Sequence, residues 1–184
     1  MKRKRLVLSN STKVTSKELV AIFAVALMAF VGILVETSMN VTFPTLMKTM
    51  HVSLNLVQWI TTGYLLTVAL LMITSAFLHQ RFKNRQLFVV GALLFILGDL
   101  ICAFAPNFWI LLLGRIVQAG CAGIAIPLMF NVVLETVPRA RLGFYMGMAG
   151  LILMIAPASG PTFGGVMVAL GSWRWIFWST LPIE

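Results

Sequence analysis

Three ionisable side chains stand inside long apolar stretches of the sequence: Glu36, Asp99 and Arg115. A charge at the centre of a membrane-spanning helix costs about 2.5–3.5 kcal/mol, so such a residue indicates a function or a specific partner. Asp99 precedes the end of its stretch by about six residues, and Arg115 follows the start of the next by about seven. At 1.5 Å per residue both lie roughly 9–10 Å below one boundary of the bilayer, so at least one carboxylate could pair with Arg115.

The neighbours of these charges help to separate a functional role from a packing role. Gln118 and Ala122 follow Arg115 at i+3 and i+7, so this helix face is polar and then small, as a cavity lining would be. We therefore assign Arg115 and Gln118 to a substrate or proton pathway. For Asp99 the sequence favours packing through an ion pair with Arg115. For Glu36 both roles stay open, including the loading and release of a proton.

Glycines and prolines recur at steps of three and four in the stretch 142–170. This seam consists of Gly143, Gly147, Gly150, Met154, Pro157, Pro161 and Gly164. Small residues on one helix face let a second backbone approach closely, and internal prolines remove backbone donors and kink a helix. The spacing is compatible with ordinary packing inside one bundle and with a bent helix that seals or rocks against a second bundle.

The composition requires a lipid environment for most of the chain. Of the 184 residues, 60% are hydrophobic and 10% are charged, whereas a soluble domain carries about 25% charged residues. Spanning a bilayer takes about 20 helical residues, and the continuous apolar runs argue against alternating strands. We predict an all-α membrane protein with five complete transmembrane helices and the start of a sixth, at residues of about 19–39, 56–78, 87–105, 108–133, 142–170 and 175–184.

Basic residues gather in alternate loops. Eleven lysines and arginines fall in the tail 1–18 and the loops 79–86 and 134–141, whereas the other loops hold only Lys48 and Arg174. The positive-inside rule then predicts a multi-pass protein of the cell membrane with a cytoplasmic N-terminus. A basic tail could also bind nucleic acid, but directly before a span it favours orientation. An aromatic belt is expected at the opposite boundary, formed by Trp59, Trp109, Trp173, Trp175 and Trp178.

The sequence lacks the patterns of an enzyme. His51 and His79 fall on opposite sides of the membrane in this topology, and Cys102 and Cys121 stand in apolar segments as small packing residues. It contains no metal-ligand spacing, nucleotide-binding glycine loop or nucleophile with a base. We therefore expect no enzymatic activity, no metal and no cofactor.

Two motifs resemble those of multidrug:proton antiporters of the major facilitator superfamily. Residues 160–165 read G-P-T-F-G-G, which is similar to the end of the family's fifth-helix antiporter motif. Residues 113–118 read L-G-R-I-V-Q and resemble the fourth-helix motif R-x-x-Q-G, with Ala119 in place of the glycine. The resemblance assigns the antiporter motif and the helix kink to Gly150, Pro157, Gly160, Pro161, Gly164 and Gly165.

Other stretches resemble the fourteen-span branch of the same family. Residues 40–44, N-V-T-F-P, look like the first-helix motif N-V-A-L-P, and W-R-W-I-F at 173–177 matches the start of helix six. The family's first-helix carboxylate usually stands at the position of Val35, whereas here it is Glu36. The resemblance places Glu36 and Asn40 in the substrate or proton pathway.

The loop after the second span is similar to the family's cytoplasmic gate. Arg81 and Arg85 match its basic positions, whereas Gln80 replaces the aspartate and Lys83 replaces the glycine. The resemblance therefore assigns a gating role to Arg81 and Arg85 only.

The resemblance implies two six-helix halves that hold substrate at their interface, and this chain would be the N-terminal half. It implies alternating-access export of amphipathic, often cationic compounds, driven by a proton gradient without any cofactor. The expected partners are the bilayer, the substrate, and a missing C-terminal half or partner chain, without nucleic acid. A second hypothesis from another class is a truncated, non-transporting membrane subunit or assembly partner.

Overall fold

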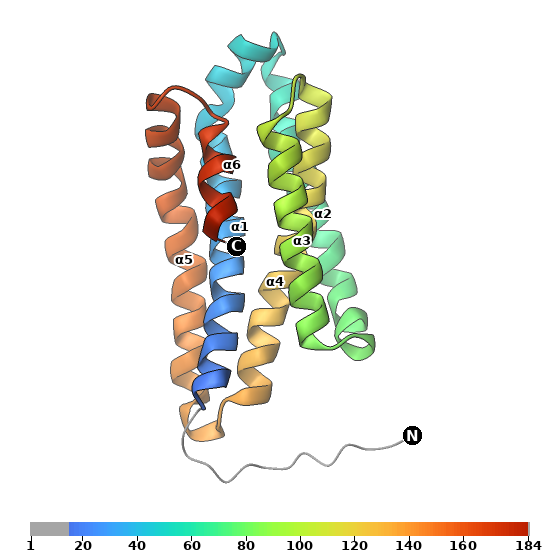
Figure 1. The fold of residues 1–184 in the computed structure, drawn as a ribbon, viewed down its shortest axis with the longest axis vertical. Helices are drawn as coiled ribbons and strands as arrows, with labels where there is room; N and C mark the ends of the chain where they lie inside the picture. The colour runs from blue at the N-terminus through green and yellow to red at the C-terminus, as the bar shows by residue number, and fades with distance from the viewer. Residues whose placement is uncertain (1–14, 184) are drawn as a thin grey trace.

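The computed structural model describes residues 15–183 as a bundle of long helices that run side by side (Figure 1). No strand occurs in that range, and a short 3-10 turn, η1, follows the last helix at Leu181–Ile183. The helices are α1 (Ser16–Met50), α2 (Leu54–Arg81), α3 (Asn84–Ala103), α4 (Phe108–Thr136), α5 (Arg139–Ala169) and α6 (Trp175–Thr180). Five of them are long and apolar enough to cross a membrane. The predicted all-α, multi-pass membrane fold is confirmed.

Several helices extend beyond the predicted spans. The first span was expected to end near residue 39, but α1 continues through Pro44 to Met50 and ends where His51 adopts a left-handed backbone with φ 53°. Polar residues do not interrupt it because their hydroxyls bond back to the same helix, as Thr42 does to the Met39 carbonyl at 2.7 Å. The basic residues of the predicted tail at positions 2–5 and 13 lie outside the described residues.

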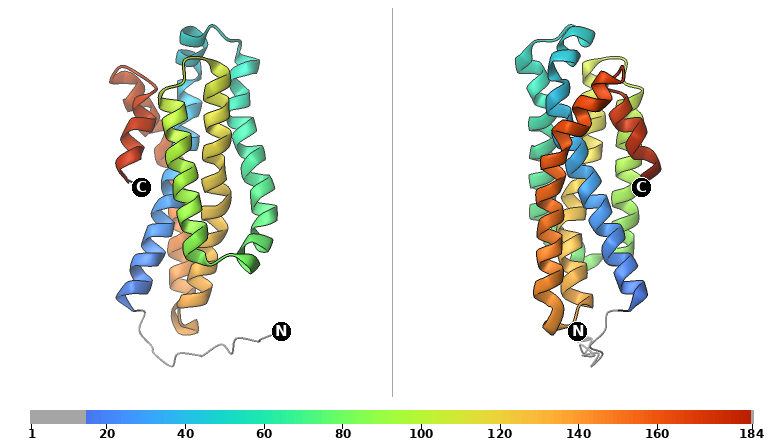
Figure 2. Two further views of the ribbon diagram at one scale, coloured as in Figure 1. Left: turned by 45° about the vertical axis from the view of Figure 1, so that its right-hand side comes forward. Right: turned by 90° about the vertical axis from the view of Figure 1, so that its left-hand side faces the viewer.

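Helix α4 is the centre of the bundle. It packs extensively against α3, α2 and α1, whereas α5 packs mainly against α1 and α6 against α3. In Figure 1 α5 lies at one edge of the bundle and α2 at the other, and in both turned views of Figure 2 the short α6 lies at an edge. Glycines allow the close contacts: a Cβ at Gly98 of α3 would lie 2.6 Å from the Gln118 Cβ of α4. The predicted polar residues of α4 are therefore enclosed by three neighbouring helices.

The connection from α5 to α6 corrects one expectation about the tryptophans. Trp173 is buried, with its ring edge-to-face against Phe177 at 6.1 Å and the Arg174 guanidinium 4.3 Å from its centre. Arg174 also donates to the Ala105 carbonyl at 2.7 Å, which ties this turn to the α3–α4 loop. The expected belt position is wrong for Trp173, because the turn folds its ring into the core. The other four tryptophans are exposed.

Candidate functional site

A chain of hydrogen bonds joins Arg115, Gln118, Asp99 and Thr180, and we call these four residues the relay. Arg115 Nη1 donates to Gln118 Oε1, and Gln118 Nε2 donates to Asp99 Oδ1 on α3. Thr180 Oγ1 of α6 donates to the second carboxylate oxygen, Oδ2, at 2.6 Å. All four side chains are buried with no exposed area. The relay therefore links α3, α4 and α6 through polar groups that neither water nor lipid reaches in this structure.

Gln118 stands between the two charges for which an ion pair was predicted. Within residues 15–183 Arg115 and Asp99 form no direct salt bridge, although their charges interact through space. The glutamine amide offers its oxygen to the guanidinium and its nitrogen to the carboxylate, so each charge keeps a hydrogen-bonded partner. Desolvated charges need such partners because an unsatisfied one costs several kcal/mol. The sequence predicted that Arg115 and Asp99 lie at one depth, and the structure shows that the Gln118 amide connects them.

Tyr64 extends the site on the opposite side of Arg115. The guanidinium carbon lies 4.2 Å from the centre of the Tyr64 ring on α2, within the range of a cation–π contact. The tyrosine hydroxyl donates to the Gly32 carbonyl of α1 at 3.2 Å. The buried arginine is thus held by an amide on one side and an aromatic face on the other.

Sequence reasoning missed Tyr64 and Thr180. Each is a hydroxyl-bearing residue in an apolar span, which is the signal that was available. Thr180 follows the start of α6 at Trp175 by five residues, so it lies roughly 7.5 Å inside the bundle end, near the depth of Asp99. Counting the depth of neutral polar residues, and not of charges alone, would have identified it.

Two donors of Arg115 are left without a partner. Nε and Nη2 are buried and form no hydrogen bond within the described part of the chain. Buried donors on a charged group are costly when unsatisfied, so these two N–H groups mark the place where an acceptor would bind most favourably.

Glu36 of α1 is the carboxylate near Arg115 that is not committed elsewhere. It is half-buried, its charge interacts with that of Arg115, and it makes no hydrogen bond to any other described side chain. Asn40 follows it by one helical turn and accepts a hydrogen bond from Thr61 Oγ1 of α2 at 2.9 Å. Glu36 therefore interacts with the relay through its charge, whereas Asn40 serves the contact between α1 and α2.

The predicted gate residues lie far from the relay. Arg81 ends α2, is exposed, and places its guanidinium 5.0 Å from the Phe77 ring centre. Arg85 is exposed in the first turn of α3, fourteen residues or about 21 Å of helix from Asp99. The polar contact that the structure does show at this loop joins Asn84 Nδ2 to Glu135 Oε2 of α4 at 2.8 Å.

Two glycines of the predicted antiporter motif meet α1. A Cβ at Gly160 would lie 2.8 Å from the Thr37 Cβ, and one at Gly164 would lie 3.0 Å from the Ser38 Cα. Ser38 Oγ donates to the Gly160 carbonyl at 2.8 Å, so the close approach also creates an interhelical hydrogen bond. Small residues at such contacts are typical of helix pairs in membranes.

The rest of the motif faces elsewhere. No atom of another described segment lies within 4 Å of a Cβ built at Gly143, Gly147, Gly150 or Gly165, and the Met154 side chain is 72% exposed. Pro157 and Pro161 stand inside α5, which runs without interruption from Arg139 to Ala169. The seam is therefore divided between a face that packs on α1 and a face that no described residue covers.

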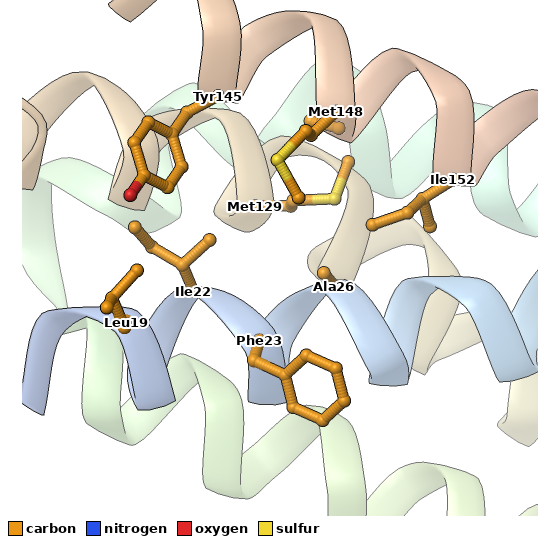
Figure 3. Close-up of a pocket in the computed structure, with 9 residues that line it drawn as sticks. Leu19, Ile22, Phe23, Ala26, Met129, Tyr145, Met148 and Ile152 are labelled. Atoms are coloured by element: carbon orange, nitrogen blue, oxygen red, sulfur yellow. The ribbon is translucent and has the colours of Figure 1, made fainter. Parts of the chain in front are cut away.

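An apolar cavity of about 250 Å³ lies between α1, α4 and α5 near the start of α1. Figure 3 shows side chains from all three helices pointing into it, among them Ile22, Met129 and Tyr145. Met129 follows Arg115 by fourteen residues, so the cavity lies roughly 21 Å along α4 from the relay. Only Tyr145 among its lining residues carries a polar side chain, so the cavity can hold apolar groups but is not itself a charge site.

Comparison with known proteins agrees with this architecture. The chain is 42% identical over 179 residues to the lincomycin resistance protein LmrB of Bacillus subtilis. This match covers 96% of this chain and 37% of that protein. It is 43% identical to LmrB of Listeria monocytogenes, over 89% of this chain and 35% of the relative. A multidrug resistance protein B homolog of Mycobacterium tuberculosis is 37% identical, over 69% of this chain and 24% of the relative.

The chain spans about a third of the length of the LmrB relatives it matches. The model of one protein family, described as Major Facilitator Superfamily, matches residues 25–183 and therefore includes every helix that contributes to the relay. The buried arginine site thus stands on a transporter scaffold, and the chain belongs to the major facilitator superfamily.

Proposed function

We propose that this chain is the N-terminal bundle of a proton-coupled multidrug exporter that works by alternating access. The observation that carries the proposal is the buried Arg115 guanidinium, whose Nε and Nη2 lack partners among the described residues and whose charge interacts with that of Glu36. A fully buried charge with free donors is costly, and in a membrane protein such a group usually marks an ion or substrate pathway.

In the proposed cycle Glu36 exchanges a proton while Arg115 holds its place. When Glu36 is ionised, the free donors of Arg115 stabilise its negative charge. When Glu36 takes up a proton, the attraction falls and α1 is released to move against α4. The proton gradient would supply the energy, without a cofactor, and amphipathic compounds would be the substrates.

The uncovered face of α5 supports the presence of a second bundle. Its glycines leave room for the close approach of another helix backbone, and no described segment occupies that room. A C-terminal half or a partner chain would cover this face and complete the substrate cavity. We propose that the N-terminus lies on the cytoplasmic side of the membrane, because the positive-inside rule favours that orientation.

The test is Arg115→Ala in the transporter formed by this chain together with its second bundle. We expect drug-driven proton movement in reconstituted vesicles to be abolished, and Glu36→Gln to have the same effect. Lys48→Ala, in the exposed last turn of α1, serves as the control for a change of charge outside the site. Lincomycin is the first compound to test, because two relatives are named for resistance to it. Unchanged antiport in Arg115→Ala would remove this residue from the mechanism.

A second experiment separates the transporter from the non-transporting assembly partner. We expect the 184-residue chain alone to confer no drug resistance, because one bundle supplies only one wall of the cavity. Co-expression with the C-terminal half of a relative such as LmrB should restore efflux if the chain is a transporter half. Robust efflux by the chain as a monomer would refute the need for a second bundle, and failure of every pairing would favour the non-transporting alternative.

A further inference from the structure

We propose that Asp99 is a positioning residue, whose carboxylate fixes the side-chain amide of Gln118 and thereby holds one two-donor edge of Arg115 free for a carboxylate. This inference deepens the proposed function, because the free edge is the part of Arg115 that would meet Glu36. The relay itself exists independently of transport, so it can be tested without it.

The first step is the orientation of the Gln118 amide. Arginine has only donors, so the amide group that faces Arg115 Nη1 must be the oxygen Oε1. The amide nitrogen then points toward α3, where it needs an acceptor, and Asp99 Oδ1 is that acceptor. In the flipped orientation two donors would face each other at Arg115 and two acceptors at Asp99. The carboxylate on α3 therefore selects one of the two amide orientations.

The second step is the fixation of Asp99 itself. Its other oxygen accepts from Thr180 Oγ1 at 2.6 Å, so both oxygens are engaged, one by α4 and one by α6. The backbones of α3 and α4 also approach closely at this depth, since a Cβ at Gly98 would lie 2.7 Å from the main-chain nitrogen of Gln118. Asp99 thus has no exposed area and a donor at each oxygen, and its position is set by three helices.

The third step is the consequence for Arg115. Gln118 occupies Nη1 and the Tyr64 ring covers the guanidinium face at 4.2 Å, which leaves Nε and Nη2. These two N–H groups point in the same direction and form one of the two-pronged edges by which arginine binds a carboxylate. Such an edge matches the two oxygens of a carboxylate better than the single oxygen of a neutral carbonyl. Without the Asp99 carboxylate, the Gln118 amide loses its fixed orientation. Nε and Nη2 of Arg115 are then no longer held in one direction.

The chain permits an exchange experiment that preserves shape and net charge. Asp99→Asn removes the carboxylate, and Gln118→Glu places two carboxylates next to each other. Combined, they move the carboxylate to position 118, where it accepts from Arg115 and from the new amide at position 99, whose oxygen can accept from Thr180 Oγ1. Every hydrogen bond of the relay then has a partner again.

We expect each single substitution to lower the folding equilibrium constant of the purified chain in lipid nanodiscs by about tenfold or more, since a charge-assisted hydrogen bond is lost or a repulsion is created. The double variant should recover most of that loss. A purely steric role for Asp99 would leave Asp99→Asn close to the unaltered chain and the two substitutions additive. Additivity of the two losses would overturn the proposal.

An infrared measurement provides a readout that stability alone does not. Asp99 is the only aspartate in the sequence, so labelling aspartate with ¹³C at the side-chain carboxyl isolates its band. Thr180→Val should shift that band, because one donor to the carboxylate is lost. Thr74→Val is the matched control, since that hydroxyl bonds only to the Leu70 carbonyl of its own helix at 2.7 Å. An identical band in the unaltered chain and in Thr180→Val would contradict the relay.

Transport then separates this inference from the proposed function. If the assembled transporter moves protons, Asp99→Asn should impair drug-driven proton movement and the double variant should restore it. If the unaltered transporter moves no protons, the proposed function fails, while the nanodisc and infrared results still decide the role of Asp99. Normal proton coupling in Asp99→Leu, which leaves the Gln118 amide nitrogen without an acceptor on α3, would show that Arg115 needs no positioning by this residue.

Discussion

Helices α4 and α5 have similar lengths and both carry glycines and internal proline, yet they stand in opposite environments. In their most apolar stretches 67% of α4 residues are buried inside the bundle, against 11% for α5. Glycines on α4 meet neighbouring helices, as at Gly123, where a Cβ would lie 2.6 Å from the Leu71 Cβ. Of the six glycines that α5 shares with the predicted seam and motif, only Gly160 and Gly164 make such contacts.

The difference shows that similar glycine-rich sequences serve different contacts. On α4 the small residues admit three helices and enclose a charged relay, so its polar motif is buried within this bundle. On α5 the small residues are divided between one face for α1 and one face without a described neighbour. The fifth-helix motif therefore has part of its surface outside the contacts that residues 15–183 make with each other.

Gly98→Ala should produce the largest loss of stability, because the added methyl group would collide with backbone atoms of α4. The new Cβ would lie 2.6–2.8 Å from the Cβ, N and Cα of Gln118. These atoms cannot move away unless the backbone of α4 shifts. We expect the free energy of unfolding to fall by about 3 kcal/mol, since overpacking is added to damage to the relay. Titration with sodium dodecyl sulfate, followed by circular dichroism, measures it.

The matched control is Gly91→Ala in the same helix. Its Cβ would come closest to the flexible end of Met28, at 3.3 Å, and would lie at an ordinary 4.0 Å from Cys121 Sγ, so the loss should be much smaller. Equal effects of the two substitutions would mean that α4 is not the tightly packed centre described above.

Gly164→Ala should give the next largest effect and reports on the α1 face of α5. The added Cβ would lie 3.0 Å from the Ser38 Cα, so the two helices would have to separate, at a cost of about 2 kcal/mol. Gly165→Ala is the adjacent control, because no other segment lies within 4 Å of its Cβ. The two variants should differ clearly in the same detergent titration, and identical curves would break the distinction between the two faces.

Ser38→Ala should have a smaller effect on that same face. It removes the hydroxyl that donates to the Gly160 carbonyl at 2.8 Å, and interhelical hydrogen bonds in membrane proteins contribute about 0.6 kcal/mol on average. Ser159→Ala is the control, since that hydroxyl bonds only to carbonyls of its own helix. A loss in Ser159→Ala as large as that in Ser38→Ala would show that the hydroxyl to Gly160 adds nothing specific to the α1–α5 contact.

Gly150→Ala should have the smallest effect on the bundle and the most informative one on transport. The Cβ enters open space, and replacing a mid-helix glycine by alanine should raise stability by about 0.5 kcal/mol. In the assembled transporter the same methyl group should reduce drug efflux, because it obstructs the approach of a second bundle. Loss of stability in the chain itself would show that this face already packs inside the bundle.

Much of the architecture could be predicted from the sequence. A helix in lipid satisfies its backbone within itself, so apolar length alone defines the spans, and they number five as expected. Counting residues from the span ends also placed Asp99 and Arg115 at one depth, and the relay joins that level. Both results depend on position along a helix axis, which is a local property of the chain.

The remainder depended on how the helices are rotated about their axes and packed. Thr180 is 81 residues from Asp99, and Tyr64 reaches Arg115 from another helix, so no local spacing could pair them. The same holds for the seam on α5, whose regular steps predict a face but not its neighbour, and for Trp173, which a folded-back turn buries. The sequence by itself determined which segments cross the membrane and how deep each polar group lies. Only the tertiary structure decided which faces meet, because side chains remote in sequence compete for the same contacts and the best mutual packing selects among them.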